Sequence, residues 1–126
     1  MKTSEQTGSE LVHHLVPDEL WELFRQIVPV KSVRRPQGGG RRRADDRQAL
    51  AAIVYITSTG RAWRQIPENF GVCWPTVYRR FAEWSQAHVW TRLLRLIADR
   101  HGERDDLNWS RQAIGAVCSR AAKDDP

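Results

Sequence analysis

The sequence is poor in cysteine and has no long apolar run. Cys73 and Cys118 lie far apart, and neither has the Cys-x-x-Cys or Cys/His spacing of a zinc site or a disulfide framework. No segment approaches the roughly 18 apolar residues of a transmembrane helix. The first ten residues are polar and lack the apolar centre of a signal peptide. We therefore expect a cytoplasmic protein that has no membrane partner and keeps both cysteines reduced.

Patterns typical of enzyme sites are also missing. The glycine run 38–40 follows no strand pattern and precedes no Gly-Lys-Ser/Thr, which excludes a phosphate-binding P-loop. The acid pairs 105–106 and 124–125 consist of adjacent residues whose side chains diverge, and His13 and His14 are interpreted as a surface pair. The sequence predicts no catalytic residue, no metal site and no cofactor.

What is present is an ordinary globular composition with an excess of cations. The 126 residues are 40% hydrophobic, which is too apolar for a disordered chain and enough for the core of one domain. Twenty Lys and Arg against fifteen Asp and Glu give a formal net charge of +5. An anionic macromolecule is therefore the expected partner, and nucleic acid is the leading candidate.

Apolar residues recur at helical spacing along most of the chain. The spacing predicts helices over 17–28, 45–59, 75–87 and 89–101, with a short turn-rich segment over 63–71. No β-alternation is found before residue 110, and only 113–117 could form a strand. The prediction is an all-α fold, a small helical bundle with a disordered leader (1–14), a helical domain (15–103) and a C-terminal tail (104–126).

The segment 31–43 is a basic loop without an acid. Its six cations surround one proline and the three glycines; they are Lys31, Arg34, Arg35, Arg41, Arg42 and Arg43. Such an arm can follow a groove of DNA and neutralise its phosphates. The alternative interpretation is a solvated run of charges.

The segments 45–59, 63–71 and 75–87 have the order of a helix-turn-helix arrangement. With Val77 inward, the outer face of the last helix carries Thr76, Arg79, Glu83 and Gln86, and Arg80 falls on its flank. Arginine at this place can bond guanine in the major groove. Alternatively, Arg79 and Glu83 form only an exposed ion pair on the helix surface. Trp21, Trp84 and Trp90 adjoin apolar faces and are predicted to lie in the core, whereas Trp63 and Trp74 are not assigned.

Several motifs, in this order and spacing, resemble the N-terminal domain of bacterial insertion-sequence transposases of the insertion-sequence-five group. They are Leu20-Trp21-Glu-Leu, Gly40-Arg-Arg-Arg-Ala-Asp-Asp-Arg47, Leu50-Ala-Ala-Ile-Val-Tyr55, Thr59-Gly-Arg-Ala-Trp-Arg-Gln-Ile-Pro67, Phe70-Gly71, Thr76-Val-Tyr-Arg-Arg-Phe-Ala-Glu-Trp84 and Leu107-Asn-Trp-Ser-Arg111. The resemblance extends over nearly all of 15–121. Within the motifs that precede residue 85, two positions depart from the family pattern: Arg42 stands where a proline is common, and Pro75 where a serine or threonine is common.

The resemblance implies a domain that binds double-stranded DNA at the terminal inverted repeats of a mobile element. The residues expected to contact DNA are Arg41, Arg42, Arg43, Arg64, Thr76, Arg79 and Arg80. In full-length relatives a ribonuclease-H-like domain with three catalytic acids follows, and Gly115 stands at the position of the first acid. The expectation is a transposase fragment that is not an enzyme on its own.

Other partners and roles stay open at this point. A second copy of the chain or a separately encoded catalytic chain are further candidate partners. The alternatives to a DNA-binding fragment of a split transposase are a repressor of transposition and an inert remnant.

Overall fold

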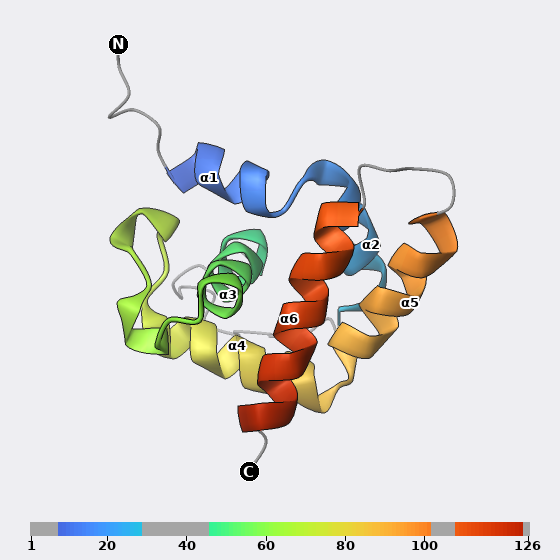
Figure 1. Ribbon diagram of the computed structural model, residues 1–126. Helices are drawn as coiled ribbons and strands as arrows, with labels where there is room; N and C mark the ends of the chain where they lie inside the picture. The colour runs from blue at the N-terminus through green and yellow to red at the C-terminus, as the bar shows by residue number, and fades with distance from the viewer. Residues whose placement is uncertain (1–7, 29–45, 102–107, 125–126) are drawn as a thin grey trace, which may run out of the picture.

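The computed structural model describes residues 8–28, 46–101 and 108–124 (Figure 1). Within these ranges the chain forms six α-helices, two short 3-10 turns and no strand. The helices are α1 (Gly8–Leu15), α2 (Asp18–Ile27), α3 (Asp46–Thr59), α4 (Trp74–Gln86), α5 (Val89–His101) and α6 (Asn108–Asp124), and the turns are η2 (Trp63–Gln65) and η3 (Glu68–Phe70). The predicted all-α bundle is confirmed.

Helix α3 is the centre of the bundle. Its residues 49–54, Ala-Leu-Ala-Ala-Ile-Val, are all fully buried, so no side of this stretch faces water. The alanines allow neighbouring helices to approach closely, and α1, α4, α6 and η3 all pack against α3. Figure 1 shows α3 nearly end-on, with α1 above it and α4 crossing below. Along this stretch the helix is therefore buried all round.

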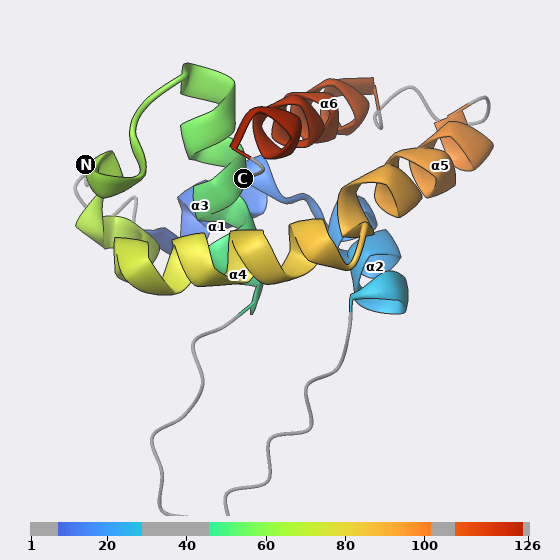
Figure 2. The same cartoon turned by 90° about the horizontal axis from the view of Figure 1, so that it is seen from below.

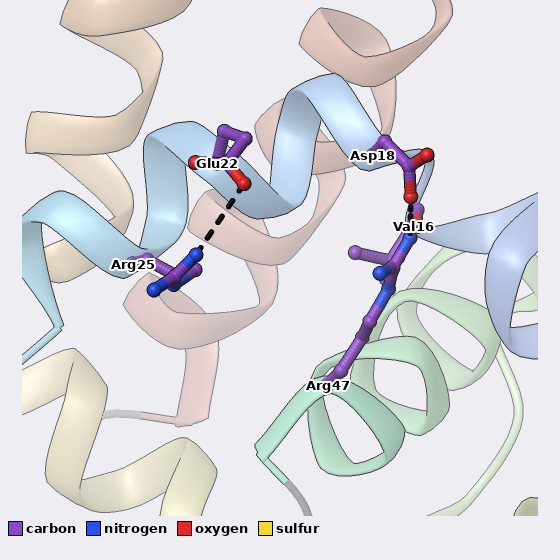
Figure 3. A network of polar contacts seen from close by, with 5 residues as sticks. All are labelled: Val16, Asp18, Glu22, Arg25 and Arg47. Atoms are coloured by element: carbon purple, nitrogen blue, oxygen red, sulfur yellow. Dashed lines mark hydrogen bonds and ion pairs between the residues drawn. The ribbon is translucent and has the colours of Figure 1, made fainter.

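Arg47, in the first turn of α3, fastens the corner between α1 and α2 (Figure 3). Its Nε and Nη2 atoms donate hydrogen bonds to the Val16 carbonyl at 3.2 and 2.7 Å, and Nη2 also donates to Asp18 Oδ1 at 2.8 Å. The hydrogen bond and the charge of Arg47 lower the pKa of the Asp18 carboxyl. The carboxyl is exposed, so water screens this pair, and the buried carbonyl contact is what fixes the corner.

Large aromatic side chains join α2, α4 and α5. The Phe24 and Trp84 rings meet edge to face with centroids 4.9 Å apart, and Trp84 and Trp90 meet similarly at 6.0 Å. The Trp90 indole N–H donates to Ser85 Oγ at 2.9 Å, so its one polar group is satisfied inside the core. The prediction that Trp84 and Trp90 belong to the core is confirmed, and Trp21 is half-buried and stacks on Phe24.

Both ends of the helical unit differ from the prediction. Residues 8–14, expected to be a disordered leader, belong to α1, whose Val12 and Leu15 are buried in the core. Residues 113–117, which could have been a strand, lie in α6, where Ile114 and Val117 are fully buried. Helix α6 packs on α3 and α5. The bundle therefore includes segments that the sequence placed in its tails.

Two glycines shape the connection between α3 and α4. Gly60 follows the last residue of α3 with φ +71°, and Gly71 follows η3 with φ +78°. A Cβ at Gly71 would lie 2.9 Å from Gln48 Nε2, so the backbone here passes close to α3. Phe70 is fully buried and its ring lies 5.5 Å from that of Tyr55. The connection is thus anchored to α3 before α4 begins.

A largely buried ion pair ties α4 to the start of α3. Arg80 Nη1 donates to Asp46 Oδ1 at 3.0 Å, and the two side chains are 9% and 29% exposed. The prediction that Arg80 lies on the exposed flank of its helix is therefore wrong. Its guanidinium is used inside the protein, where it compensates the charge of Asp46.

None of the helices in the described ranges combines the length and apolarity needed to cross a membrane.

Replacing Arg80 should destabilise the fold. In Arg80→Ala, Asp46 loses this partner, and we expect the free energy of unfolding to fall by about 2–3 kcal/mol, below the ~3–5 kcal/mol of fully buried pairs because Asp46 is partly exposed. Urea denaturation measures the change. Arg79→Ala is the matched control. Arg79 is the residue next to Arg80 and is exposed, so this substitution should change the free energy of unfolding by less than about 0.5 kcal/mol. Equal effects of the two variants would contradict the assignment.

Helix α6 should contribute to the same cooperative unit. Because Ile114 is fully buried, Ile114→Ala should lower the free energy of unfolding by about 2–5 kcal/mol, whereas Gln112→Ala on the exposed side of the helix should have little effect. A single thermal transition that shifts only in the Ile114 variant is expected. If both variants melt like the unmodified protein, α6 is not part of the bundle.

Candidate nucleic-acid interface

Helix α4 lies on the outside of the bundle with one face built into the core. Val77, Phe81 and Trp84 recur at i, i+4 and i+7 and are buried against the other helices. In the view from below, α4 runs across the near side of α3 (Figure 2). Its inner face is fixed, and its outer face is turned away from the core.

The outer face of α4 carries Pro75, Arg79 and Gln86, all exposed. At 100° per residue these three positions lie within a narrow stripe opposite Val77. Glu83 lies beside the stripe and is half-buried. Arg79, predicted from the sequence as an outward residue, is placed as expected.

Thr76 lies at the edge of this face and is half-buried. Its Oγ1 is 3.3 Å from Cys73 Sγ, within hydrogen-bond distance. Hydrogen bonding from the Thr76 hydroxyl and backbone N–H lowers the pKa of the exposed Cys73 thiol. The first turn of α4 contains no acid, and the side chain of its N-cap residue, Cys73, makes no capping hydrogen bond, so neither offsets the positive end of the helix dipole.

Arg64 comes from η2, the turn that packs on α4. The turn is closed by the Ala62 N–H, which donates to Gln65 Oε1 at 2.8 Å, and it is anchored by Trp63, whose ring lies 4.7 Å from that of Phe81. Arg64 itself is exposed. Three of the predicted residues, Arg64, Thr76 and Arg79, therefore belong to one unit formed by η2 and α4.

The other predicted residues are not part of this surface as described. Arg80 is held inside by Asp46. Arg41, Arg42 and Arg43 lie outside the described residues. In the described part of the chain, no group of three or more His, Cys, Asp or Glu residues is arranged to hold a metal ion.

The structure also brings to α4 an arginine that the sequence did not single out. Arg120 of α6 places its guanidinium 5.0 Å from the centre of the Trp63 ring, and its Nη2 donates to the Arg61 carbonyl at 3.3 Å. Arg61 is exposed, with its guanidinium 5.8 Å from the Tyr55 ring. The sequence did not indicate Arg120, because its segment was assigned to the tail and its contacts are with residues of other elements.

Comparisons with known proteins agree on one family. A family model described as "Putative transposase of IS4/5 family" matches residues 16–94. The chain is 33% identical over 112 residues to the "Insertion element IS402 uncharacterized 16.2 kDa protein" of Burkholderia cepacia, covering 85% of this chain and 74% of that protein. It is 31% identical over 94 residues to "Uncharacterized protein y4sN" of Sinorhizobium fredii (strain NBRC 101917 / NGR234), covering 73% of this chain and 66% of that protein.

No solved structure matches the chain. The family model, however, spans more than half of the sequence, from the end of α1 into α5, and includes the whole of α3, η2 and α4. The protein belongs to the IS4/5 family of transposases.

Proposed function

We propose that this chain binds double-stranded DNA and that α4 is its recognition helix. The observation that carries the proposal is the division of α4 into a locked inner face and an exposed outer face that bears Arg79. An α-helix about 10–12 Å across fits the major groove, which is about 12 Å wide. Arg79 is then the residue best suited to bond the edge of a guanine.

The surroundings of α4 support contacts to phosphates. Arg64 is exposed on the turn that packs against α4, and the N-terminus of α4 carries no acid in its first turn. Backbone amides at a helix N-terminus and arginine side chains are frequent phosphate ligands. Thr76 is the weaker candidate, because its hydroxyl already lies against Cys73.

We extend the proposal to the basic segment on the strength of its sequence. Arg43 precedes Asp46 by three residues in the sequence. Asp46 is fixed to α4 by Arg80. We propose that Arg41, Arg42 and Arg43 add phosphate or minor-groove contacts to those of α4.

The target we propose is the terminal inverted repeat of an insertion element, because the chain belongs to a transposase family. We propose that this polypeptide contributes binding and that strand cleavage resides in other residues. Gly115, which stands where the resemblance places the first catalytic acid, lies within α6 and offers no side-chain ligand.

Replacing Arg79 should weaken DNA binding without unfolding the protein. Arg79→Ala is expected to lower affinity for a terminal-repeat duplex by about 5- to 150-fold, corresponding to the roughly 1–3 kcal/mol of one bidentate arginine–guanine contact. Fluorescence anisotropy at two salt concentrations measures the change, and affinity of the unmodified protein should fall as salt rises.

Arg92→Ala is the matched control, since Arg92 is also exposed but lies on α5. It removes the same charge and should change affinity by less than about twofold if the effect at Arg79 is local. An equal loss in both variants, or binding that is insensitive to salt, would contradict the role of α4.

Bound DNA should protect Cys73 from alkylation. This thiol is exposed at the start of α4, and its lowered pKa increases the reactive thiolate fraction near neutral pH. A terminal-repeat duplex should slow its reaction with iodoacetamide, as measured by mass spectrometry. Cys118, half-buried on α6, is the internal control and should not slow to the same extent. A duplex that is bound but leaves the Cys73 rate unchanged would mean that DNA lies elsewhere.

A further inference from the structure

A hollow with aromatic walls lies beside the first half of α4. It has a volume of about 390 Å³ and is lined by Trp63, Trp74, Tyr78 and Arg120. These residues come from η2, α4 and α6, and Arg120 is the contribution of α6 to the lining. Among the residues that the structure describes, no carboxylate lines it.

Two of the rings are exposed although they are large and apolar. Trp74 is 40% exposed and Tyr78 is 39% exposed, and their i, i+4 spacing places them on one flank of α4. The buried face of α4 is formed by other residues, among them Val77 and Phe81, so the exposed parts of these two rings lie outside the core. An exposed aromatic pair at the rim of a hollow indicates a ligand surface.

The walls of the hollow are held in place before any ligand arrives. The Trp63 ring meets Tyr78 edge to face at 5.5 Å and packs on Phe81 at 4.7 Å. The Arg120 guanidinium lies over Trp63 at 5.0 Å and is fixed by its hydrogen bond to the Arg61 carbonyl. The lining of the hollow therefore combines aromatic rings with one guanidinium group, both held by contacts within the protein.

The chemistry of this surface selects a planar aromatic group that belongs to a polyanion. Three exposed arginines lie on the same elements or next to them. Arg61 precedes η2, Arg64 lies in η2 and Arg79 lies in α4. Aromatic platforms flanked by arginines bind unpaired bases by stacking while the cations hold the backbone. We propose that the hollow binds unpaired nucleobases of single-stranded DNA adjacent to the duplex held by α4, an inference that rests on the proposed function.

The test compares three DNA probes on the full chain by fluorescence anisotropy. They are a blunt duplex, the same duplex with a six-thymidine single-stranded extension, and a free twelve-thymidine strand. The unmodified protein should bind the extended duplex more tightly than the blunt one. The double variant Trp74→Ala/Tyr78→Ala should lose at least about fivefold in affinity for the extended duplex and the free strand, and less than about twofold for the blunt duplex.

Two further variants make the readout specific. Trp74→Phe/Tyr78→Phe keeps two stacking rings and should retain most of the preference for the extended duplex. Trp109→Ala removes a residue that is 42% exposed but stands eleven positions, or about 16 Å of helix, before Arg120 on α6, and it should change nothing.

The outcomes separate this inference from the proposed function. If the extension adds no affinity, if the alanine variant keeps the preference, or if Trp109→Ala loses as much, the hollow is not a base site. If the alanine variant instead abolishes self-association in sedimentation while single-strand affinity is unchanged, the hollow is a protein interface and the inference is wrong. Failure to bind the blunt duplex refutes the role of α4, and the free thymidine strand still tests the hollow.

Discussion

The structure depends on one constraint, which is that α3 has no polar side along 49–54. A helix buried all round needs neighbours on every side, and here α1, α4, α6 and η3 pack around it. Covering α3 uses the apolar face of α4 and leaves the opposite face of α4 to the solvent. The same requirement brings α6 to α4, and α6 contributes Arg120 to the lining of the aromatic hollow. Both candidate DNA surfaces are therefore consequences of how the central helix is covered.

Polar contacts at the start of α3 fix the positions of the neighbouring helices more precisely than apolar packing alone. Asp46 and Arg47 are adjacent and oppositely charged, and each is fastened to a different partner: Asp46 to Arg80 of α4, and Arg47 to the Val16 carbonyl at the corner of α1 and α2. Apolar packing alone tolerates sliding, whereas hydrogen bonds of partly buried charges have a fixed geometry. The position of α4, and hence of Arg79, is thus defined relative to the N-terminus of α3.

Helical spacing in the sequence predicted α2, α3, α4 and α5, because each has a sustained apolar face. It missed α1, a short helix whose core contacts come from only a few residues such as Val12 and Leu15. It also missed α6, because the apolar run 113–117 is compatible with a strand when its packing against α3 is not known. Arg79 was placed correctly by its helical angle. Arg80 was not, because its partner Asp46 lies in another helix, and sequence spacing carries no information about such pairs. The assignments of Arg41, Arg42 and Arg43 stay predictions.

The central claim is that one cooperative bundle around α3 presents α4 to DNA. Hydrogen exchange of the backbone amides, with and without a terminal-repeat duplex, tests it most directly, because it reports on every helix at once. The account predicts that α3 exchanges slowest, that α6 exchanges with the core, and that DNA slows exchange in η2 and the first half of α4 but not in α5. Protection by DNA that falls on α5 instead, or an α6 that exchanges independently of α3, would contradict it.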